Sequence, residues 1–224
     1  MPDQVLVFDM DGVLVDVTGS YRETIRQTVR YFTGRDAGNE TIQDLKNSGG
    51  WTNDWALAQR IIRDLGVEVD YDTVVAQFQS IFLGNGEDGL MRREKWAARP
   101  GLLEGLGLRY RLAVFTGRPR EEARMTLERF APSLVFDPLV AAEDVRNGKP
   151  APDGLLEIVA ATGIQRIWYV GDTVDDARSA RAAGVPFIGI ASKGSPRLAE
   201  LKSLFAAENA VAVLDDINQL ESVL

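Results

Sequence analysis

Short apolar runs recur along the chain and predict the strands of a buried sheet. They lie at residues 5–8 (VLVF), 112–115 (LAVF), 167–170 (IWYV), 187–190 (FIGI) and 210–214 (AVAVL), with a weaker run near 134–140. Runs without polar alternation are typical of strands covered on both faces. Helical patterns separate them, at 121–130, 154–161, 174–183, 197–205 and 216–224. Strands that alternate with helices predict an α/β domain with a parallel sheet.

Residues 17–96 break this alternation and predict an all-helical insert. The apolar positions at helical spacing are Tyr21, Ile25, Val29 and Phe32, then Trp55, Ala58, Ile62 and Leu65, and finally Val74, Phe78 and Ile81. We therefore predict a core made of residues 1–16 and 97–224 and a helical cap at 17–96. The insert follows the first strand, at the sheet edge where ligands enter, so we interpret it as a lid. The alternative is a purely structural subdomain.

The charge and composition restrict the classes of function. Asp and Glu number 33 against 25 Lys and Arg, a net charge of -8, which disfavours nucleic acid as a partner. The chain has no Cys and no His, which excludes disulfides, thiolate nucleophiles and imidazole catalysis. Catalysis must then use carboxylates, Lys, Arg, hydroxyls and a hard metal. No apolar run approaches the ~20 residues of a membrane span and no leader pattern is visible, so we expect a cytoplasmic protein without a membrane partner.

Polar residues follow three of the predicted strands where each strand ends. Asp9 and Asp11 follow the first strand, Thr116-Gly117-Arg118 follows 112–115, and Asp172 follows 167–170. Lys149 lies between the last two, in a loop held by prolines. Ligands of parallel sheets bind beyond the carboxyl ends of the strands. Because two carboxylates close together need a compensating cation, the first strand end predicts a divalent metal and, with it, a phosphate.

Each of these positions also has an ordinary structural explanation. Asp172 is placed as an N-cap of the next helix, Thr116-Gly117 fits a simple turn, and Lys149 fits an exposed loop. Their joint occurrence at converging strand ends favours the functional interpretation.

The segments DMDGVLVD, FTGRP, GKPAPD and GDTVDDARSARAAG resemble the four ordered motifs of the haloacid dehalogenase-like hydrolases. They extend from Asp9 to Gly184, and the helical insert resembles the cap of the subgroup that includes phosphoglycolate phosphatase and β-phosphoglucomutase. The resemblance implies a Rossmann-like parallel sheet in which the strands before residues 9, 116 and 172 are adjacent at the centre. It also implies Mg²⁺ as the cofactor.

The carboxylates have separate roles in this resemblance. Asp9 and Asp172 offer the hard oxygen ligands that suit Mg²⁺, and the backbone carbonyl of Asp11 is implied as a further ligand. Asp9 is also the implied nucleophile, forming an aspartyl-phosphate, while the Asp11 carboxylate protonates the leaving group and then activates water. Asp176, one turn after Asp172, is implied to orient metal-bound water or a neighbouring lysine, with Asp175 as the less favoured alternative.

The remaining motif residues are implied to hold the phosphoryl group. Thr116 and the backbone N–H of Gly117 would bind phosphate oxygens, and Lys149 would neutralise charge on Asp9 and on the transferring group. A dehalogenase would not need Asp11, because a halide leaving group takes no proton. P-type ATPases carry Thr at that position and have membrane segments. We therefore predict a Mg²⁺-dependent phosphatase of a small phosphorylated metabolite, as a monomer or homodimer. The alternatives are a phosphomutase and a non-catalytic binding or regulatory protein.

The cap stretch 46–55 contains the candidates for substrate selection, Lys46, Trp51 and Asn53. It joins two predicted helices and concentrates a cation, amides and two tryptophans. The alternative is structural, with Asn53 as an N-cap and Trp51 as packing. The stretch 85–89 is typical of a turn and not of a phosphate loop.

Arg118 departs from the small residue that is commoner after this motif. It is a candidate contact for a substrate anion, and the alternative is an ion pair with Glu121 or Glu122.

Overall fold

The computed structural model describes residues 2–85 and 88–224, in two compact units. The core unit is Met1–Val15 with Trp96–Leu224, and the cap unit is Asp16–Lys95. The two boundaries predicted from the sequence, after residues 16 and 96, each lie one residue further along the chain than those of the structure. Each unit is described below by itself. The turn prediction for residues 85–89 includes 86 and 87, which lie outside the described residues.

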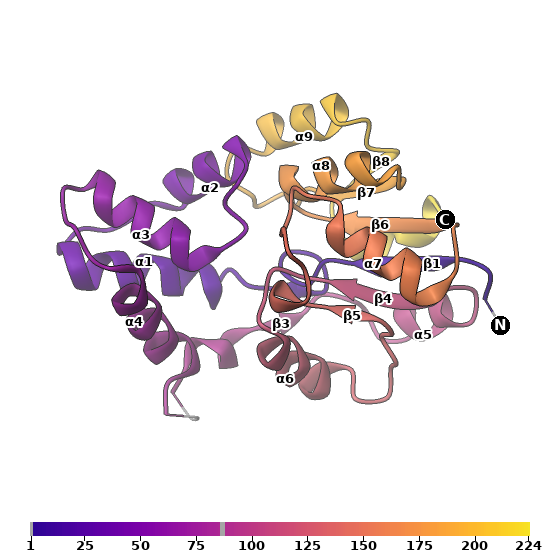
Figure 1. Ribbon diagram of the computed structural model, residues 1–224, viewed down its shortest axis with the longest axis horizontal. Helices are drawn as coiled ribbons and strands as arrows, with labels where there is room; N and C mark the ends of the chain where they lie inside the picture. Colours follow the sequence, from indigo (N-terminus) through magenta and orange to yellow (C-terminus); the bar gives the residue numbers. More distant parts are fainter. Residues whose placement is uncertain (1, 86–87) are drawn as a thin grey trace. The chain divides into compact units, whose positions relative to one another are not determined.

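Among the described residues, the core unit contains a six-stranded parallel sheet in the order β5-β4-β1-β6-β7-β8 (Figure 1). The strands are β1 (Val5–Phe8), β4 (Arg111–Phe115), β5 (Leu139–Val140), β6 (Ile167–Gly171), β7 (Phe187–Ile190) and β8 (Ala212–Leu214). In the central register, Val7 lies opposite Ala113 on β4 and Tyr169 on β6. The Rossmann-like α/β fold is confirmed, with the strands before residues 9, 116 and 172 adjacent.

Helices of the core unit flank this sheet. They are α5 (Leu102–Gly107), α6 (Arg120–Phe130), α7 (Asp153–Thr162), α8 (Val174–Ala183) and α9 (Leu198–Ala207), with short 3₁₀ helices η2 (Ala142–Asp144) and η3 (Ile217–Ser222). The helices predicted from 121, 154, 174 and 197 onward are confirmed. The α-helix predicted at 216–224 is wrong, because Asp216 accepts a hydrogen bond from the Asn218 backbone and the chain forms a tighter 3₁₀ turn. The predicted strand at 134–140 shortens to two residues after Pro138, which has no N–H to donate.

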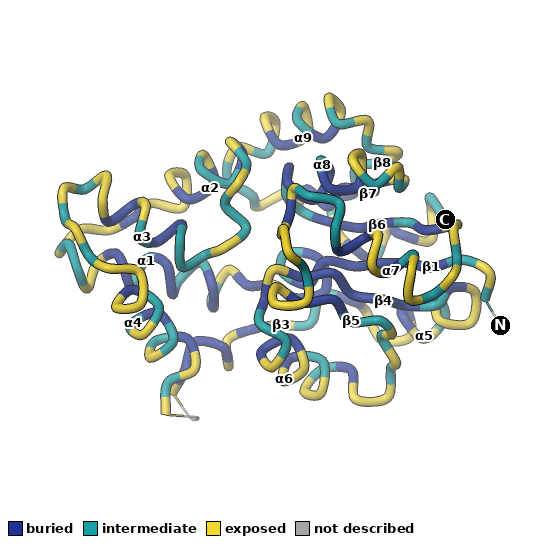
Figure 2. The backbone as a smooth tube through the Cα atoms, viewed as in Figure 1, coloured by how far each residue is buried: buried dark blue, intermediate teal, exposed yellow. Residues whose placement is uncertain are grey.

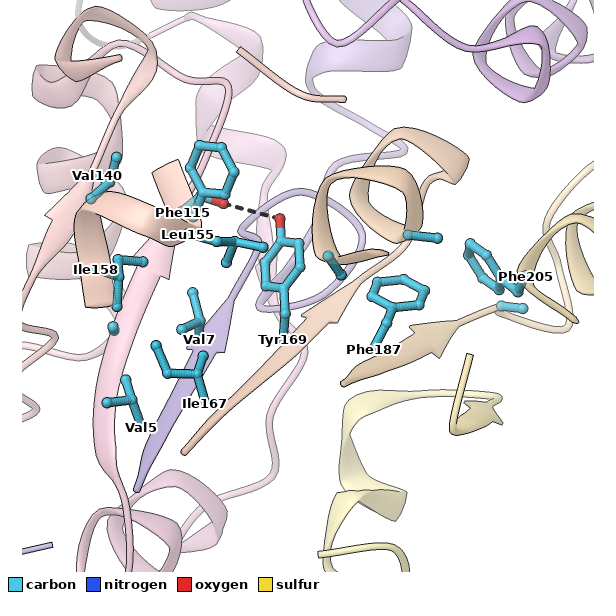
Figure 3. Packing of buried hydrophobic residues seen from close by; sticks show 14 of the residues in the cluster. Val5, Val7, Phe115, Val140, Leu155, Ile158, Ile167, Tyr169, Phe187 and Phe205 are labelled. Atoms are coloured by element: carbon cyan, nitrogen blue, oxygen red, sulfur yellow. Dashed lines mark hydrogen bonds between the residues drawn. The ribbon is translucent and has the colours of Figure 1, made fainter. Parts of the chain in front are cut away.

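Both faces of the sheet are buried, as the strand pattern predicts (Figure 2). Val5 and Val7 face a cluster that includes Leu155 of α7 and Ala177 of α8, while their neighbour Leu6 is also fully buried. Figure 3 shows a row of aromatic rings in this cluster. The ring centroids of Phe115 and Tyr169 are 6.0 Å apart, those of Tyr169 and Phe187 are 6.1 Å apart, and those of Phe187 and Phe205 are 5.4 Å apart. These packed rings form an apolar layer next to the carboxyl ends of the strands.

The cap unit is helical, as predicted. It consists of α1 (Tyr21–Thr33), α2 (Asn39–Ser48), α3 (Asp54–Asp64), α4 (Tyr71–Leu83) and the 3₁₀ helix η1 (Leu90–Arg93). Ile25, Val29, Ile62 and Phe78 from the predicted stripes are buried. Two-residue strands β2 (Val15–Asp16) and β3 (Lys95–Trp96), too short for a periodic pattern, pair where the chain passes between the units. Within the described part of the chain, no helix is both long enough and apolar enough to cross a bilayer.

Candidate active site

The ends of the three central strands bring the predicted motif residues to one edge of the sheet. The backbone N–H of Asp9 donates to the Val170 carbonyl at 2.8 Å, and that of Thr116 donates to the Val140 carbonyl at 3.0 Å. Asp172 follows β6 directly. The sheet ladder therefore continues to the first site residues and fixes their backbones.

Three carboxylates meet at this edge. Asp9, Asp172 and Asp176 each place a carboxylate oxygen within 4.8 Å of the others. Asp9 and Asp176 are buried, and Asp172 is half-buried. An all-oxygen set of this kind fits Mg²⁺, because the chain offers no imidazole or thiolate that would favour a softer metal. Asp9 and Asp172 could hold the ion; that they do so, and that the backbone carbonyl of Asp11 joins them, remains a prediction.

Lys149 lies between two of these carboxylates. Its Nζ is 2.8 Å from Asp9 Oδ1 and 2.7 Å from Asp176 Oδ1. The same ammonium is 4.9 Å from the centre of the Phe115 ring and 5.5 Å from that of Tyr169, at the end of the aromatic row. Burial disfavours the charge on Lys149, but Asp176 and Asp9 outweigh burial and raise its pKa above the usual range. Lys149 is therefore a fixed positive charge beside Asp9, and the exposed-loop alternative is wrong.

The surroundings of Asp9 and Asp176 shift the pKa values of these two carboxyl groups in opposite directions. Burial raises the pKa of Asp9 to about 7; Lys149 opposes this shift, and the neighbouring charges of Asp176 and Asp11 add to it. For Asp176 burial also favours the neutral form, but Lys149 and hydrogen bonds from Thr173 and Tyr169 outweigh burial and lower the pKa. Lys149 thus pairs with both carboxylates at nearly equal distance, and Asp176 has additional hydrogen-bond donors. Asp9 carries the charge that a bound cation would stabilise most.

The side chains that hold Asp176 were not among the sequence-predicted site residues. The Tyr169 hydroxyl donates to Asp176 Oδ1 at 2.6 Å, while the Thr173 backbone N–H and hydroxyl donate to Oδ2 at 2.9 and 2.6 Å. Tyr169 reaches up from β6 toward Phe115, whose carbonyl lies 3.5 Å from the phenol oxygen (Figure 3). A capping-box pattern links Thr173 and Asp176, and that signal is visible in the sequence. Nothing in the apolar strand pattern distinguishes Tyr169 from core.

The turn after β1 is shaped around Asp172. Gly12 has φ +73°, and a Cβ built there would lie 2.0 Å from Asp172 Oδ2. Only glycine combines this left-handed backbone with so close an approach. Asp11, one residue earlier, keeps 30% of its side chain exposed. The turn therefore brings Asp172 against the backbone of the first motif and leaves the Asp11 carboxylate accessible.

Arg118 lies against Asp11. Its Nε and Nη2 donate to Asp11 Oδ1 at 2.8 and 2.5 Å, and only 1% of the Arg118 side chain is exposed. Neither interpretation of Arg118 from the sequence, a contact with a substrate anion or an ion pair with Glu121 or Glu122, included Asp11. Glu121 lies on the exposed side of α6 near Arg124, and Glu122 is buried. The local spacing that suggested a pair between Arg118 and the first turn of α6 gives no information on a partner 107 residues away.

Thr116 and Gly117 occupy the loop after β4. Thr116 is buried, and its hydroxyl accepts a hydrogen bond from the Arg118 backbone N–H at 3.1 Å. Gly117 is exposed at the tip of the turn. The chain bends at Gly117 and Arg118, and phosphate binding by Thr116 and Gly117 remains a prediction.

A protein-family model described as haloacid dehalogenase-like hydrolase matches residues 4–184. The chain belongs to this hydrolase family. The match includes the four motifs and the helical insert, and the parallel sheet is the architecture that the resemblance implies.

The chain is similar to proteins with several different names. A relative from Phytophthora nicotianae, imidazoleglycerol-phosphate dehydratase, is 35% identical over 198 residues, covering 84% of this chain and 43% of that one. The chain thus spans less than half the length of that relative. Phosphoglycolate phosphatase of Escherichia coli K12 is 26% identical over 203 residues, covering 83% of this chain and 80% of the enzyme. A haloacid dehalogenase-like protein of unknown function from Agrobacterium tumefaciens superposes with a TM-score of 0.75 at 20% identity, over 100% and 97% of the two chains, which shows a shared fold.

The cap candidates of this hydrolase make contacts inside the cap unit. Lys46 Nζ is 2.8 Å from Asp54 Oδ1, with both side chains largely buried. Asn53 caps α3, accepting from the Ala56 N–H at 3.0 Å and donating to the Tyr71 hydroxyl at 2.9 Å. The Arg60 guanidinium lies 5.8 Å from the centre of the Trp51 ring. The N-cap role of Asn53 is confirmed, and substrate contact by the three residues remains a prediction.

Proposed function

We propose that this hydrolase is a Mg²⁺-dependent phosphatase that acts on a small phosphorylated metabolite through an aspartyl-phosphate on Asp9. The observation that carries the proposal is the contact of the Asp9 carboxylate with Lys149 at 2.8 Å, in a group with Asp172 and Asp176. A fixed ammonium and a hard-metal site beside one carboxylate match the charge of a phosphoryl group. The phosphoglycolate phosphatase relatives support the same class of reaction.

The first half-reaction transfers the phosphoryl group to Asp9. A carboxylate oxygen of Asp9 forms a bond to phosphorus as the bond from phosphorus to the ester oxygen breaks. Lys149 stays protonated, since Asp176 and Asp9 stabilise its charge, and it offsets negative charge on the transferring group. Thr116 and the Gly117 N–H hold phosphoryl oxygens. When bound, Mg²⁺ would neutralise further charge between Asp9, Asp172 and the phosphate.

Asp11 supplies and removes the protons. Its carboxylic acid donates a proton to the departing alkoxide, and the resulting carboxylate then accepts a proton from the water that attacks phosphorus. That attack breaks the bond between phosphorus and Asp9, releases inorganic phosphate and restores both aspartates. The partly exposed Asp11 carboxylate is suited to meeting substrate and water in turn.

A panel of phosphorylated metabolites tests the proposal, with inorganic phosphate measured with Mg²⁺ and with chelator. We expect Mg²⁺-dependent phosphate release that is absent from the Asp9→Asn variant. Chromatography of the products from sugar phosphates distinguishes a phosphomutase from a phosphatase, because a phosphomutase would give an isomeric phosphate ester without free phosphate. A folded protein that releases no phosphate and forms no isomer across the panel would contradict the proposal.

A further inference from the structure

Arg118 is a buried cation directly behind the proposed proton-transfer residue. It is among the largest side chains of the chain that are fully buried, and the guanidinium contacts Asp11 from the core side. Arginine stays protonated in proteins, so its charge must be compensated where it is buried. Asp11 is one partner of that guanidinium, through two hydrogen bonds to Oδ1. The two residues are therefore bound to each other, and neither can be placed independently.

The guanidinium is itself held in place from the opposite side. Arg118 Nη1 donates to the Thr126 hydroxyl at 2.8 Å, and Thr126 is fully buried on α6. The backbone of Arg118 is fixed as well, because its N–H donates to Thr116 Oγ1 and its carbonyl accepts from Ala142. A planar guanidinium held at several atoms keeps its N–H donors in a fixed geometry. Two of these donors, on Nε and Nη2, are directed to Asp11.

We propose that Arg118 is a positioning residue that fixes the Asp11 carboxylate for proton exchange with the leaving group and with water. The inference rests on the proposed function. Arg118 Nε and Nη2 converge on Oδ1, so Oδ1 is committed to the core and the exchanged proton is carried on Oδ2. General acid catalysis needs the donor within hydrogen-bond distance of the leaving oxygen, and a freely rotating carboxylate spends less time there. Arg118 acts through Asp11 in this proposal, because its Nε and Nη2 donate to Asp11 and its Nη1 donates to Thr126.

The dependence of rate on the leaving group separates this role from a structural one. In Arg118→Met, turnover of an alkyl phosphate, whose leaving group needs a proton, should fall by roughly 10- to 100-fold. Turnover of p-nitrophenyl phosphate, whose leaving group needs little protonation, should fall only about two- to threefold. Loss of folded protein would lower both rates by the same factor. Arg118→Lys should recover only part of the difference, because one ammonium cannot hold Asp11 and Thr126 with the geometry of a guanidinium.

Three further variants control the measurement. Arg124→Met removes an exposed arginine of α6, the helix that carries Thr126, and should leave both rates unchanged; Arg124 pairs with Glu128. Thr126→Val removes the hydrogen bond that holds Arg118 but leaves Asp11 unchanged. It should lower turnover of the alkyl phosphate more than that of p-nitrophenyl phosphate, by smaller factors than Arg118→Met. In an Asp11→Asn background, Arg118→Met should add little, because the group that it positions is already lost.

Crystal structures of the wild type and of Arg118→Met test the positioning independently of any activity. We expect a single Asp11 carboxylate orientation in the wild type and a displaced or multiple orientation in the variant. Equal losses for both leaving groups, or an unchanged Asp11 orientation in Arg118→Met, would overturn the inference. If the wild type hydrolyses no ester, the proposed function fails and the Asp11 orientation alone decides whether Arg118 positions it.

Discussion

The site residues of the core unit and the candidate residues of the cap unit are held in different ways. In the core, Asp9, Lys149 and Asp176 come from segments far apart in the sequence and meet as a buried ion cluster. Lys149 contacts two carboxylates, and Asp176 is also held by Tyr169 and Thr173. Removing Lys149 would leave two buried carboxylates without their cation, which is far more costly than losing a surface contact.

In the cap unit, the contacts of the candidates are mostly local. Lys46 pairs with Asp54 eight residues away, and Asn53 caps its own helix. Such contacts stabilise one turn or one helix end and do not constrain a distant charge. From this difference we expect that the core arrangement specifies the reaction and that changes in the cap stretch leave the charge cluster unaltered. The predictions below test this division, beginning with the largest effect.

Asp9→Asn should abolish phosphate release while the protein stays folded. An amide does not attack phosphorus and is a poorer ligand for Mg²⁺ than a carboxylate. Phosphate release, with circular dichroism as the folding control, measures the effect. Near-normal release by the folded variant would rule out Asp9 as the nucleophile.

Removal of Mg²⁺ should abolish turnover reversibly. The cluster of Asp9, Asp172 and Asp176 contains only oxygen ligands, so Mg²⁺ should restore activity after chelation and Ca²⁺ should inhibit, because Ca²⁺ accepts looser coordination. Rates in excess chelator and after titration of each ion provide the measurement. Full activity in chelator would contradict the metal site.

Asp11→Asn should slow turnover by roughly 10²–10⁴, the usual contribution of general acid-base catalysis. Metal binding should be retained, because only the backbone carbonyl of Asp11 is an implied ligand. Comparison of kcat for good and poor leaving groups, with Mg²⁺ affinity measured by calorimetry, tests both parts. An equal loss for all leaving groups would count against the acid role.

Substitution of Lys46, Trp51 or Asn53 by Ala should change preference among substrates by about tenfold to a hundredfold, with little effect on p-nitrophenyl phosphate. Asn53→Ala also removes the N-cap of α3, so Asp70→Ala, which removes the N-cap of α4, is the matched control. Both should lose about 1 kcal/mol of stability. Only Asn53→Ala should alter the substrate profile, and unchanged profiles for all three would make the stretch a simple helix connection.

The smallest effect concerns stability without metal. Burial raises the pKa of Asp9 to about 7 in the fold, above the ordinary aspartate value of 3.8. Between those two pH values the folded state binds a proton that the unfolded state does not, so this group's contribution to stability decreases as pH rises toward 7. Asp9→Asn in chelator should therefore gain stability relative to wild type at pH 8 and less at pH 5.5. Urea unfolding at both pH values measures the difference, and a gain larger at pH 5.5 would contradict the raised pKa.

The sequence predicted the sheet because its strands are continuous apolar runs that end in polar motif residues. A regular helical pattern begins at Val174 and ends before Gly184, so the sequence predicted α8 at its observed bounds. The short helix α5 was missed because Gly105 and Gly107 dilute its apolar pattern. Strands β2 and β3 contain too few residues for any period to be visible.

The partners of the site residues were harder to predict than the residues themselves. The contact of Tyr169 with Asp176 depends on the direction in which a strand residue points, and that of Arg118 with Asp11 depends on the proximity of two strand ends. Neither contact can be predicted from the hydrophobic periodicity of the local sequence. The motif positions predict which groups carry the chemistry, and only the packed sheet determines which of them lie within hydrogen-bond distance of one another.

The surroundings of Lys149 have a consequence for chemical labelling. An amine reacts with acylating reagents only in its neutral form, and the burial of Lys149 between two carboxylates denies it both that form and contact with the reagent. The chain has four other lysines, among them Lys193, whose side chain is 81% exposed. Acylation of the folded protein would therefore modify Lys193 and pass over Lys149, so that resistance at this single amine reports an intact charge cluster in a protein whose substrate need not be known.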